Sequence, residues 1–176
     1  VSKLITAVGI MKLQEMKKLK LNEKVFGPKG ILNDTTYNNG IKDQRYYDIT
    51  VEQLLRHQAG FNNYAGDPVS STRYIMMQNR LTTPPDHKTL LKILLKRHLG
   101  YTPGQGKCYS NLGYMILSMI IEKKSGMKYE NFMQKYVLQP AGCYDMHIAG
   151  TYLKDRRPNE TKYYMHQGSI PVYEYN

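Results

Sequence analysis

The stretch from Pro103 to Gly126, PGQGKCYSNLGYMILSMIIEKKSG, constrains the fold more than any other part of this 176-residue chain. Its glycines and proline form a turn, and apolar residues then recur at the three- and four-residue steps of an amphipathic helix. The helix is expected to begin at about Ser110 or Asn111, since both residue types cap free backbone N–H groups, and to end at Gly126. The positions expected to face a core are Leu112, Met115, Ile116, Met119 and Ile120.

Shorter helices are predicted on either side, separated by loops rich in Gly, Pro and Asn. Thr50-Val51-Glu52-Gln53 matches a capping box, in which the first and last side chains satisfy each other's backbone N–H groups. Asp86 is expected to cap a helix that carries four leucines. The expected helices cover about 50–60, 70–79, 86–100 and 129–137, a long loop with short strand pieces covers 27–48, and weak strand patterns fall at 162–165 and 171–175.

The first residues, VSKLITAVGIMKLQE, have the pattern of a helix that is already in progress. No residue precedes Val1 to cap it, so either Ser2 caps a slightly shorter helix or the helix began earlier in a longer chain. The helix is expected to reach Leu19 or Lys20. One face would carry Leu4, Ile5, Val8, Met11 and Met16.

The composition is basic and slightly poor in apolar residues. Lys and Arg number 25 against 14 Asp and Glu, a formal charge of +11. Such a balance suits an anionic partner, but the cations are spread along the chain, so solvated helix faces are the simpler interpretation. No nucleic-acid partner is expected, because zinc-finger spacing, an arginine-rich arm and an RRM-like aromatic signature are all missing.

Hydrophobic residues make up 41% of the chain, and replacing the 16 Tyr by the 14 Gly in that count gives about 40%. This lies below the roughly 45–50% usual for globular domains, which fits either a chain with much loop or a piece whose core is completed by something absent. The longest nearly apolar run, 115–121, is far shorter than the about 20 residues that a membrane-spanning helix needs. No signal peptide is visible, which says nothing about location if the start of the protein is missing.

The two cysteines and five histidines show no metal-ligand spacing, so no structural metal is expected. Cys108 and Cys143 either form a disulfide in an oxidising compartment or remain as two free buried thiols.

Three Tyr-x-Asn triplets begin at Tyr37, Tyr109 and Tyr129. With 16 tyrosines in the chain, such a triplet has little weight by itself. Only the triplet Tyr109-Ser110-Asn111 lies between a turn and a long amphipathic helix.

That stretch resembles the serine β-lactamase and penicillin-binding protein family, in its class C-like branch with D-Ala-D-Ala carboxypeptidases and esterases. ITVEQLLRHQAGF (49–61) looks like the family's stretch that ends in His-x-x-Gly, and VLQPAGCYDM (137–146) looks like the segment that closes its helical lobe. The resemblance covers most of the chain. It implies the helical lobe of a two-lobe α/β fold over 1–150, with most of the antiparallel sheet lobe missing, and an extension over 151–176 leading back to that lobe.

The resemblance also supplies the site. SKLITAVGIMKL looks like the continuation of the family's Ser-x-x-Lys box, with Lys3 as its lysine, so the nucleophilic serine would stand one residue before Val1. Residues i and i+3 share a helix face, which brings the two side chains together. Tyr109 would share proton transfer with Lys3, and Asn111 would bind the substrate amide and orient the lysine. His57 is expected to be a packing residue rather than a base, and Asn111 has the alternative role of a helix cap.

The family's third box, Lys-Thr-Gly or His-x-Gly, has no convincing counterpart. His166-Gln167-Gly168 fits the letters, but it follows Tyr109 much too closely. A second Ser-x-x-Lys at Ser125–Lys128 straddles Gly126 and is interpreted as a chance match.

Two hypotheses follow. In the first, the parent protein is a serine acyl-hydrolase that is periplasmic, bound to the cell envelope or secreted, and that needs no cofactor. Its substrate would be a β-lactam, a peptidoglycan stem peptide, another D-amino-acid peptide or an ester. The chain as given would then be inactive. In the second, the chain is a non-catalytic binding module for an anionic partner. The sequence does not indicate an oligomeric state.

Overall fold

The computed structural model describes residues 2–63, 66–150 and 153–161. The chain forms two compact units, Val1–Gly142 and Cys143–Asn176. All of the predicted site residues lie in the first unit. This division by compactness does not test the predicted division into a lobe and an extension at residue 150.

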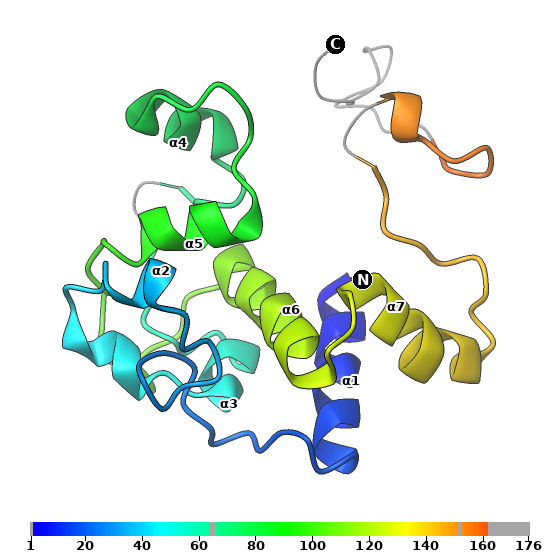
Figure 1. Ribbon diagram of the computed structural model, residues 1–176, viewed down its shortest axis with the longest axis horizontal. Coiled ribbons are helices and arrows are strands. Elements are labelled where there is room, and N and C mark those ends of the chain that lie inside the picture. Colours follow the sequence, from blue (N-terminus) through cyan, green and yellow to red (C-terminus); the bar gives the residue numbers. More distant parts are fainter. Residues whose placement is uncertain (1, 64–65, 151–152, 162–176) are drawn as a thin grey trace. The chain divides into compact units, whose positions relative to one another are not determined.

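The first unit is a cluster of helices around α6 (Figure 1). The long helix α6 packs against α1, α3 and α7, and the short helix α2 packs against α5. Its elements are α1 (Ser2–Glu15), α2 (Thr35–Asn38), the 3₁₀ turn η1 (Gln44–Asp48), α3 (Val51–Leu55), α4 (Thr72–Asn79), α5 (His87–Leu94), α6 (Asn111–Ser125), α7 (Tyr129–Met133), the π-helical turn η2 (Gln134–Leu138) and the 3₁₀ turn η3 (Gln139–Ala141). In the second unit, the 3₁₀ turn η4 spans Leu153–Asp155.

The described residues are mainly helical, as predicted, and hold no strand, only one isolated antiparallel bridge between Lys24 and Thr50. The strand pieces expected within 27–48 are wrong, because α2 and η1 form there instead. Asp34 and Asp43 cap these two turns by accepting hydrogen bonds from the backbone N–H groups of Thr36 and Arg45. The predicted strands at 162–165 and 171–175 lie outside the described residues, as does His166-Gln167-Gly168.

The predicted helix starts are confirmed by their caps. The Ser110 hydroxyl accepts a hydrogen bond from the Gly113 N–H (3.0 Å), and Gly126 ends α6 with a φ of +72°. Both bonds of the Thr50–Gln53 capping box are present at α3. Asp86 accepts from the Thr89 N–H (2.8 Å) at α5. Residues that satisfy otherwise free N–H groups therefore set these boundaries.

Three predicted helix ends are wrong. Helix α1 stops at Glu15 because Lys17 turns left-handed (φ +56°) and the Lys18 N–H donates to the Leu13 carbonyl (2.9 Å), a Schellman-type closure. Helices α3 and α5 end at Leu55 and Leu94, well before Gly60 and Gly100. After α3 the first residue with a left-handed backbone is His57 (φ +59°). Sequence patterns associate this conformation with glycine.

Helix α1 buries a different face from the one expected. Its buried residues are Thr6, Gly9, Ile10 and Leu13. Gly9 marks this face, because a Cβ there would lie only 2.6 Å from the Met133 sulfur. The predicted apolar face is largely exposed instead, with Leu4 70%, Val8 44% and Met11 47% accessible. These three side chains are called the α1 apolar stripe below.

We expect the α1 apolar stripe to bind hydrophobic dyes. Replacing Leu4, Val8 and Met11 together by Gln should lower the fluorescence of bound anilinonaphthalene sulfonate, because exposed contiguous apolar surface is what such dyes recognise. Each substitution should change the free energy of unfolding by less than about 0.5 kcal/mol, as is usual for surface sites.

Leu13→Ala is the matched control on the same helix. Leu13 is fully buried, so its truncation should cost about 3 kcal/mol and leave the stripe intact. Undiminished dye fluorescence in the triple variant would show that the dye site lies elsewhere.

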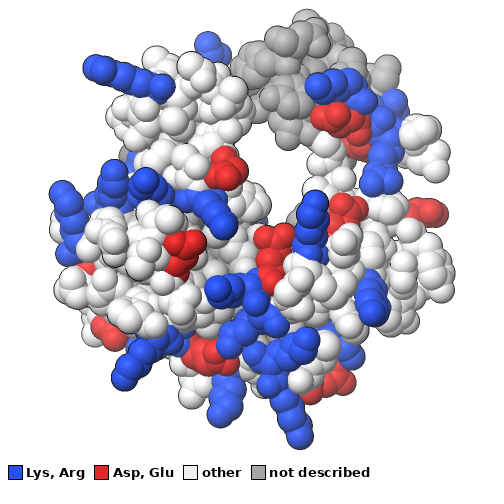
Figure 2. All heavy atoms as spheres, in the orientation of Figure 1, with Lys and Arg blue, Asp and Glu red and all other residues white. Residues whose placement is uncertain are grey.

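Basic side chains are distributed rather than gathered. Figure 2 shows Lys and Arg over much of the visible face, with Asp and Glu among them. Several cations are paired, such as Lys124 with Glu23 (2.5 Å) and Lys12 with Glu15 (2.7 Å). Among the described residues, no helix combines the length and apolar character needed to cross a membrane.

Candidate active site

The centre of the candidate site is a contact between two helix starts. Lys3 lies in the first turn of α1 and Asn111 is the first residue of α6. The Lys3 Nζ donates to the Asn111 Oδ1 at 2.5 Å, although 108 positions separate the two residues. The packing of α1 on α6 therefore brings the predicted lysine and asparagine together.

Tyr109 completes this cluster. The Lys3 Nζ lies 4.7 Å from the centroid of the Tyr109 ring and 5.5 Å from that of Tyr114, both within the range of a cation–π contact. Tyr109 is 56% exposed, so its ring is open to a ligand. Lys3, Tyr109 and Asn111 thus converge, as the sequence predicts; their catalytic roles stay a prediction.

The other two Tyr-x-Asn triplets take no part in this cluster. Tyr37 is buried in the core. The Tyr129 hydroxyl shares a hydrogen bond with the Thr6 hydroxyl (2.7 Å), and burial raises its pKa above the usual value. Their context in the sequence correctly separates them from Tyr109.

The interpretation of Asn111 as a helix cap is wrong. The Ser110 hydroxyl performs that function, which leaves the Asn111 side chain available to Lys3. The Asn111 backbone N–H donates to Asp67 Oδ2 (2.8 Å), and its Nδ2 lies 3.4 Å from the Ser70 hydroxyl.

Sequence reasoning missed two residues in the loop after α3 whose side chains hydrogen-bond to the backbone of the Tyr109-Ser110-Asn111 triplet. Asn63 donates through Nδ2 to the Tyr109 carbonyl (2.6 Å), and Asp67 accepts from Asn111 as described above. Asn and Asp are also the usual residues of turns, so their presence in a Gly-containing loop gave no signal of this second role.

His57 packs between two aromatic rings, as its predicted packing role requires. Its ring centroid lies 4.9 Å from that of Tyr109 and 5.1 Å from that of Tyr114. Its Nδ1 accepts a hydrogen bond from the Ser110 N–H (3.2 Å). Burial lowers the pKa of His57, and the charges of Lys3 and Lys107 lower it further.

Cys108 and Cys143 are both partly exposed, so the expectation of two buried thiols is wrong. They lie in different units of the chain, and the disulfide between them stays a prediction. Within the described residues, no group of three or more His, Cys, Asp or Glu side chains is arranged to hold a metal ion.

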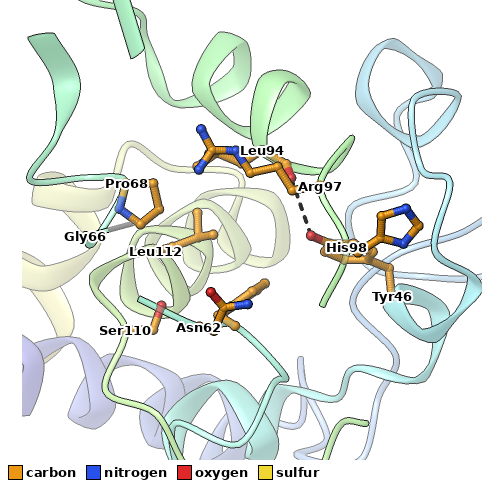
Figure 3. Close-up of a pocket in the computed structure, with 10 residues that line it drawn as sticks. Tyr46, Asn62, Gly66, Pro68, Leu94, Arg97, His98, Ser110 and Leu112 are labelled. Atoms are coloured by element: carbon orange, nitrogen blue, oxygen red, sulfur yellow. Dashed lines mark hydrogen bonds between the residues drawn. The ribbon is translucent and has the colours of Figure 1, made fainter. Parts of the chain in front are cut away.

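A small cavity lies beside the Lys3 cluster rather than in it. Figure 3 shows Ser110, Asn62 and Leu112 on one side and Leu94, Arg97 and His98 on another. Its volume is only about 70 Å³, whereas ligand pockets usually reach roughly 300 Å³ or more. We therefore place the candidate site at the open surface around Lys3, Tyr109 and Asn111.

Comparison with known proteins shows the family of the chain. A model of the family described as Beta-lactamase matches residues 1–173. The chain belongs to this family. Penicillin-binding protein 4* of Bacillus subtilis is 27% identical over 164 residues, covering 92% of this chain and 32% of that protein. Protein flp of Staphylococcus aureus is 27% identical over 175 residues, covering 97% and 31%.

Solved structures of the same fold cover almost all of the chain. The octameric penicillin-binding protein homologue from Pyrococcus abyssi superposes with a TM-score of 0.57 at 25% identity, covering 97% of this chain and 36% of that one. A D-stereospecific amidohydrolase from Streptomyces sp. gives a TM-score of 0.70 at 23% identity, covering 99% and 51%; at this identity it shows the fold alone. The chain spans about a third of the length of the two curated relatives.

Proposed function

We propose that the chain is the helical lobe of a serine acyl-hydrolase of the β-lactamase and penicillin-binding protein type. The observation that carries the proposal is the convergence of Lys3, Tyr109 and Asn111 in a chain of this family. In the intact protein the α1 apolar stripe would pack against the sheet lobe, which accounts for its exposure here.

The reaction would proceed through an acyl-serine. A serine one place before Val1 would share the first turn of α1 with Lys3, and its hydroxyl would attack the substrate carbonyl. Lys3 and Tyr109 would take the hydroxyl proton and return one to the leaving group. Asn111 would donate to the substrate amide while its Oδ1 holds the lysine. Water or an amine would then attack the acyl-serine, releasing the acyl group and restoring the hydroxyl.

The substrate proposed is an amide or ester of this family's range: a β-lactam, a peptidoglycan stem peptide or other D-amino-acid peptide, or an ester. The name of the Bacillus subtilis relative supports the penicillin-reactive end of this range. A periplasmic, cell-envelope or secreted location is proposed with it. No cofactor is required by these steps.

The second candidate, a binding module for an anionic partner, has weaker support. It rests on the formal charge of +11. The cations are dispersed and several are paired with carboxylates, which favours solvated helix faces over a single binding surface.

Residues 1–176 alone should react with no acyl donor. We expect neither hydrolysis of a chromogenic cephalosporin nor covalent uptake of a fluorescent penicillin, because the proposed nucleophile is not among them. The intact protein, expressed from its complete reading frame, should be labelled at the serine that precedes Val1.

Mass spectrometry of the labelled peptide distinguishes the outcomes. A label on any serine within residues 1–176 would show that the nucleophile is misplaced. An intact protein without a serine at that position, and without any labelling, would overturn the enzyme proposal and favour the binding module.

A further inference from the structure

The three residues of the Tyr-Ser-Asn triplet are each held by one side chain of the segment 57–67. The Ser110 N–H donates to the imidazole of His57, the Tyr109 carbonyl accepts from Asn63, and the Asn111 N–H donates to Asp67. These three hydrogen bonds join consecutive backbone groups to three side chains. Together they hold the extended backbone that leads into α6. Of these three partners, His57 also places its own ring against the ring of Tyr109.

The backbone of His57 is held in an unfavourable conformation. Its φ of +59° is left-handed, a conformation that is unfavourable for a residue other than glycine. Two donors fix it there, because the Cys108 N–H (3.0 Å) and the Tyr101 hydroxyl (3.2 Å) both donate to the His57 carbonyl. Strained residues that the surroundings over-determine in this way cluster at functional sites.

This conformation gives the imidazole two contacts at once. It inserts the ring between Tyr109 and Tyr114, the same two tyrosines that face the Lys3 Nζ. It also aims Nδ1 at the Ser110 N–H. His57 therefore supports Tyr109 through its ring and through the backbone of the next residue.

We propose that His57 is a positioning residue that holds Tyr109 against Lys3, and that it does so only with a neutral imidazole. The inference rests on the proposed function and assigns a role to a residue that the reaction steps above do not use. A protonated ring has an N–H at Nδ1 and cannot accept from Ser110. It also places a positive charge beside Lys3.

The groups around the ring agree with a neutral histidine. The charges that act on it are those of Lys3 and Lys107, the rings of Tyr109 and Tyr114 lie against it, and the Tyr101 hydroxyl and the Cys108 N–H bind the carbonyl of the same residue. The pKa of His57 is lowered by burial and by the two lysines. The folded state therefore binds this proton less readily than the unfolded state, so the contact is intact above the ordinary value of 6.5 and is lost as the pH falls through the folded pKa.

Gly and Asn both tolerate a left-handed backbone. Substituting His57 by either residue therefore changes the acceptor of the Ser110 hydrogen bond without disturbing the backbone conformation. His57→Gly removes the ring and its acceptor, and we expect the acylation rate of the intact protein to fall about 100-fold, the effect of a displacement of about 1 Å in a reacting group. His57→Asn keeps an amide oxygen that can accept from Ser110 and does not titrate. At pH 8 its rate should lie between those of His57→Gly and the wild type, because the acceptor is kept and the ring contact is lost, and at lower pH it should lose less activity than the wild type does.

Arg80→Gly is the matched control, since Arg80 is also left-handed (φ +53°) and ends α4. It should leave the acylation rate unchanged. The second readout is the titration of the His57 ring by NMR, in protein with labelled histidine, assigned by its loss in His57→Asn. The Ser110 amide and Tyr109 ring signals should shift with the same midpoint, below 6.5.

Any one of three results would overturn the inference. The acylation rate of His57→Gly could equal that of Arg80→Gly, or the acylation rate of His57→Asn could fall at low pH as much as that of the wild type. The Ser110 and Tyr109 NMR signals could also fail to shift as His57 titrates. An intact protein that reacts with no acyl donor would overturn the proposed function alone. In that case the coupled titration, measured without turnover, still decides whether His57 holds Tyr109.

Discussion

Replacing Lys3 by Ala in the intact protein should slow acylation by a fluorescent penicillin about 10³-fold, within the range of about 10²–10⁴ that a positioned proton-transfer group supplies. The Lys3 Nζ is bonded to Asn111 and faces the Tyr109 ring, so its loss removes the group to which the serine proton would pass. Tyr109→Phe should produce a decrease of similar order. The rate of label incorporation, followed by in-gel fluorescence, measures both.

Because the two residues would act as one unit, their effects should not add. The double variant Lys3→Ala/Tyr109→Phe is expected to lose little more than the slower single variant. Lys12→Ala and Tyr74→Phe are the matched controls: Lys12 lies on the same helix and pairs with Glu15, and Tyr74 is an exposed tyrosine of α4. If Lys3→Ala is labelled as fast as Lys12→Ala while circular dichroism shows both folded, Lys3 has no part in the reaction.

Local signals in the sequence predict helix starts better than helix ends. Ser110, Thr50 and Asp86 each cap the helix that the pattern assigns to them, since capping depends on residues within one turn. Helix ends depend on which residue turns left-handed. Lys17 and His57 do so without being glycine. Lys17 is held by a local closure on Leu13 and Gln14, whereas the His57 carbonyl also accepts from Tyr101 and Cys108, far along the chain.

The buried face of α1 could not be read from α1 alone. Its apolar residues lie around more than one side of the helix, and the choice between sides depends on α6 and α7, which present Ile121 and Met133 to Gly9. A close approach of two helices at a glycine is a property of the pair. Leu4, Val8 and Met11 therefore appeared to be core residues although they are exposed.

The candidate site was predictable in its three named residues and not in their supports. Lys3, Tyr109 and Asn111 lie in stretches whose order along the chain carries the family resemblance. Asn63 and Asp67 are turn-forming residues in a loop, and only the folded chain shows their side chains against the triplet. The lowered pKa of His57 likewise arises from burial in the folded chain and from Lys3 and Lys107, which no local pattern connects to it.

Asp43→Asn should destabilise the chain more than any other single loss of charge that we consider, by about 2 kcal/mol, within the range for hydrogen bonds to a charged group. The Asp43 side chain is only 7% exposed and accepts from both the Nε and Nη2 of Arg45 (3.0 and 2.7 Å). It also accepts from the Leu99 N–H (3.0 Å), so it connects η1 to the segment after α5. An asparagine lacks the charge and one acceptor, and leaves Arg45 with a neutral partner.

The effect of Asp43→Asn should depend on pH with a definite sign. Hydrogen bonds from Arg45 hold the pKa of Asp43 far below its ordinary value of 3.8. The carboxylate therefore contributes its full stability above about pH 4 and loses it progressively as the pH falls below the unfolded value. Urea unfolding at pH 7, 5 and 3 should show the same difference in unfolding free energy between wild type and variant at pH 7 and 5, and a smaller difference at pH 3.

Asp48→Asn supplies the control, because its pair with Lys24 (3.3 Å) is solvent-exposed and is expected to contribute less than about 1 kcal/mol. Equal stabilities of the two variants at pH 7 would mean that Arg45 and Leu99 find other partners when Asp43 is lost.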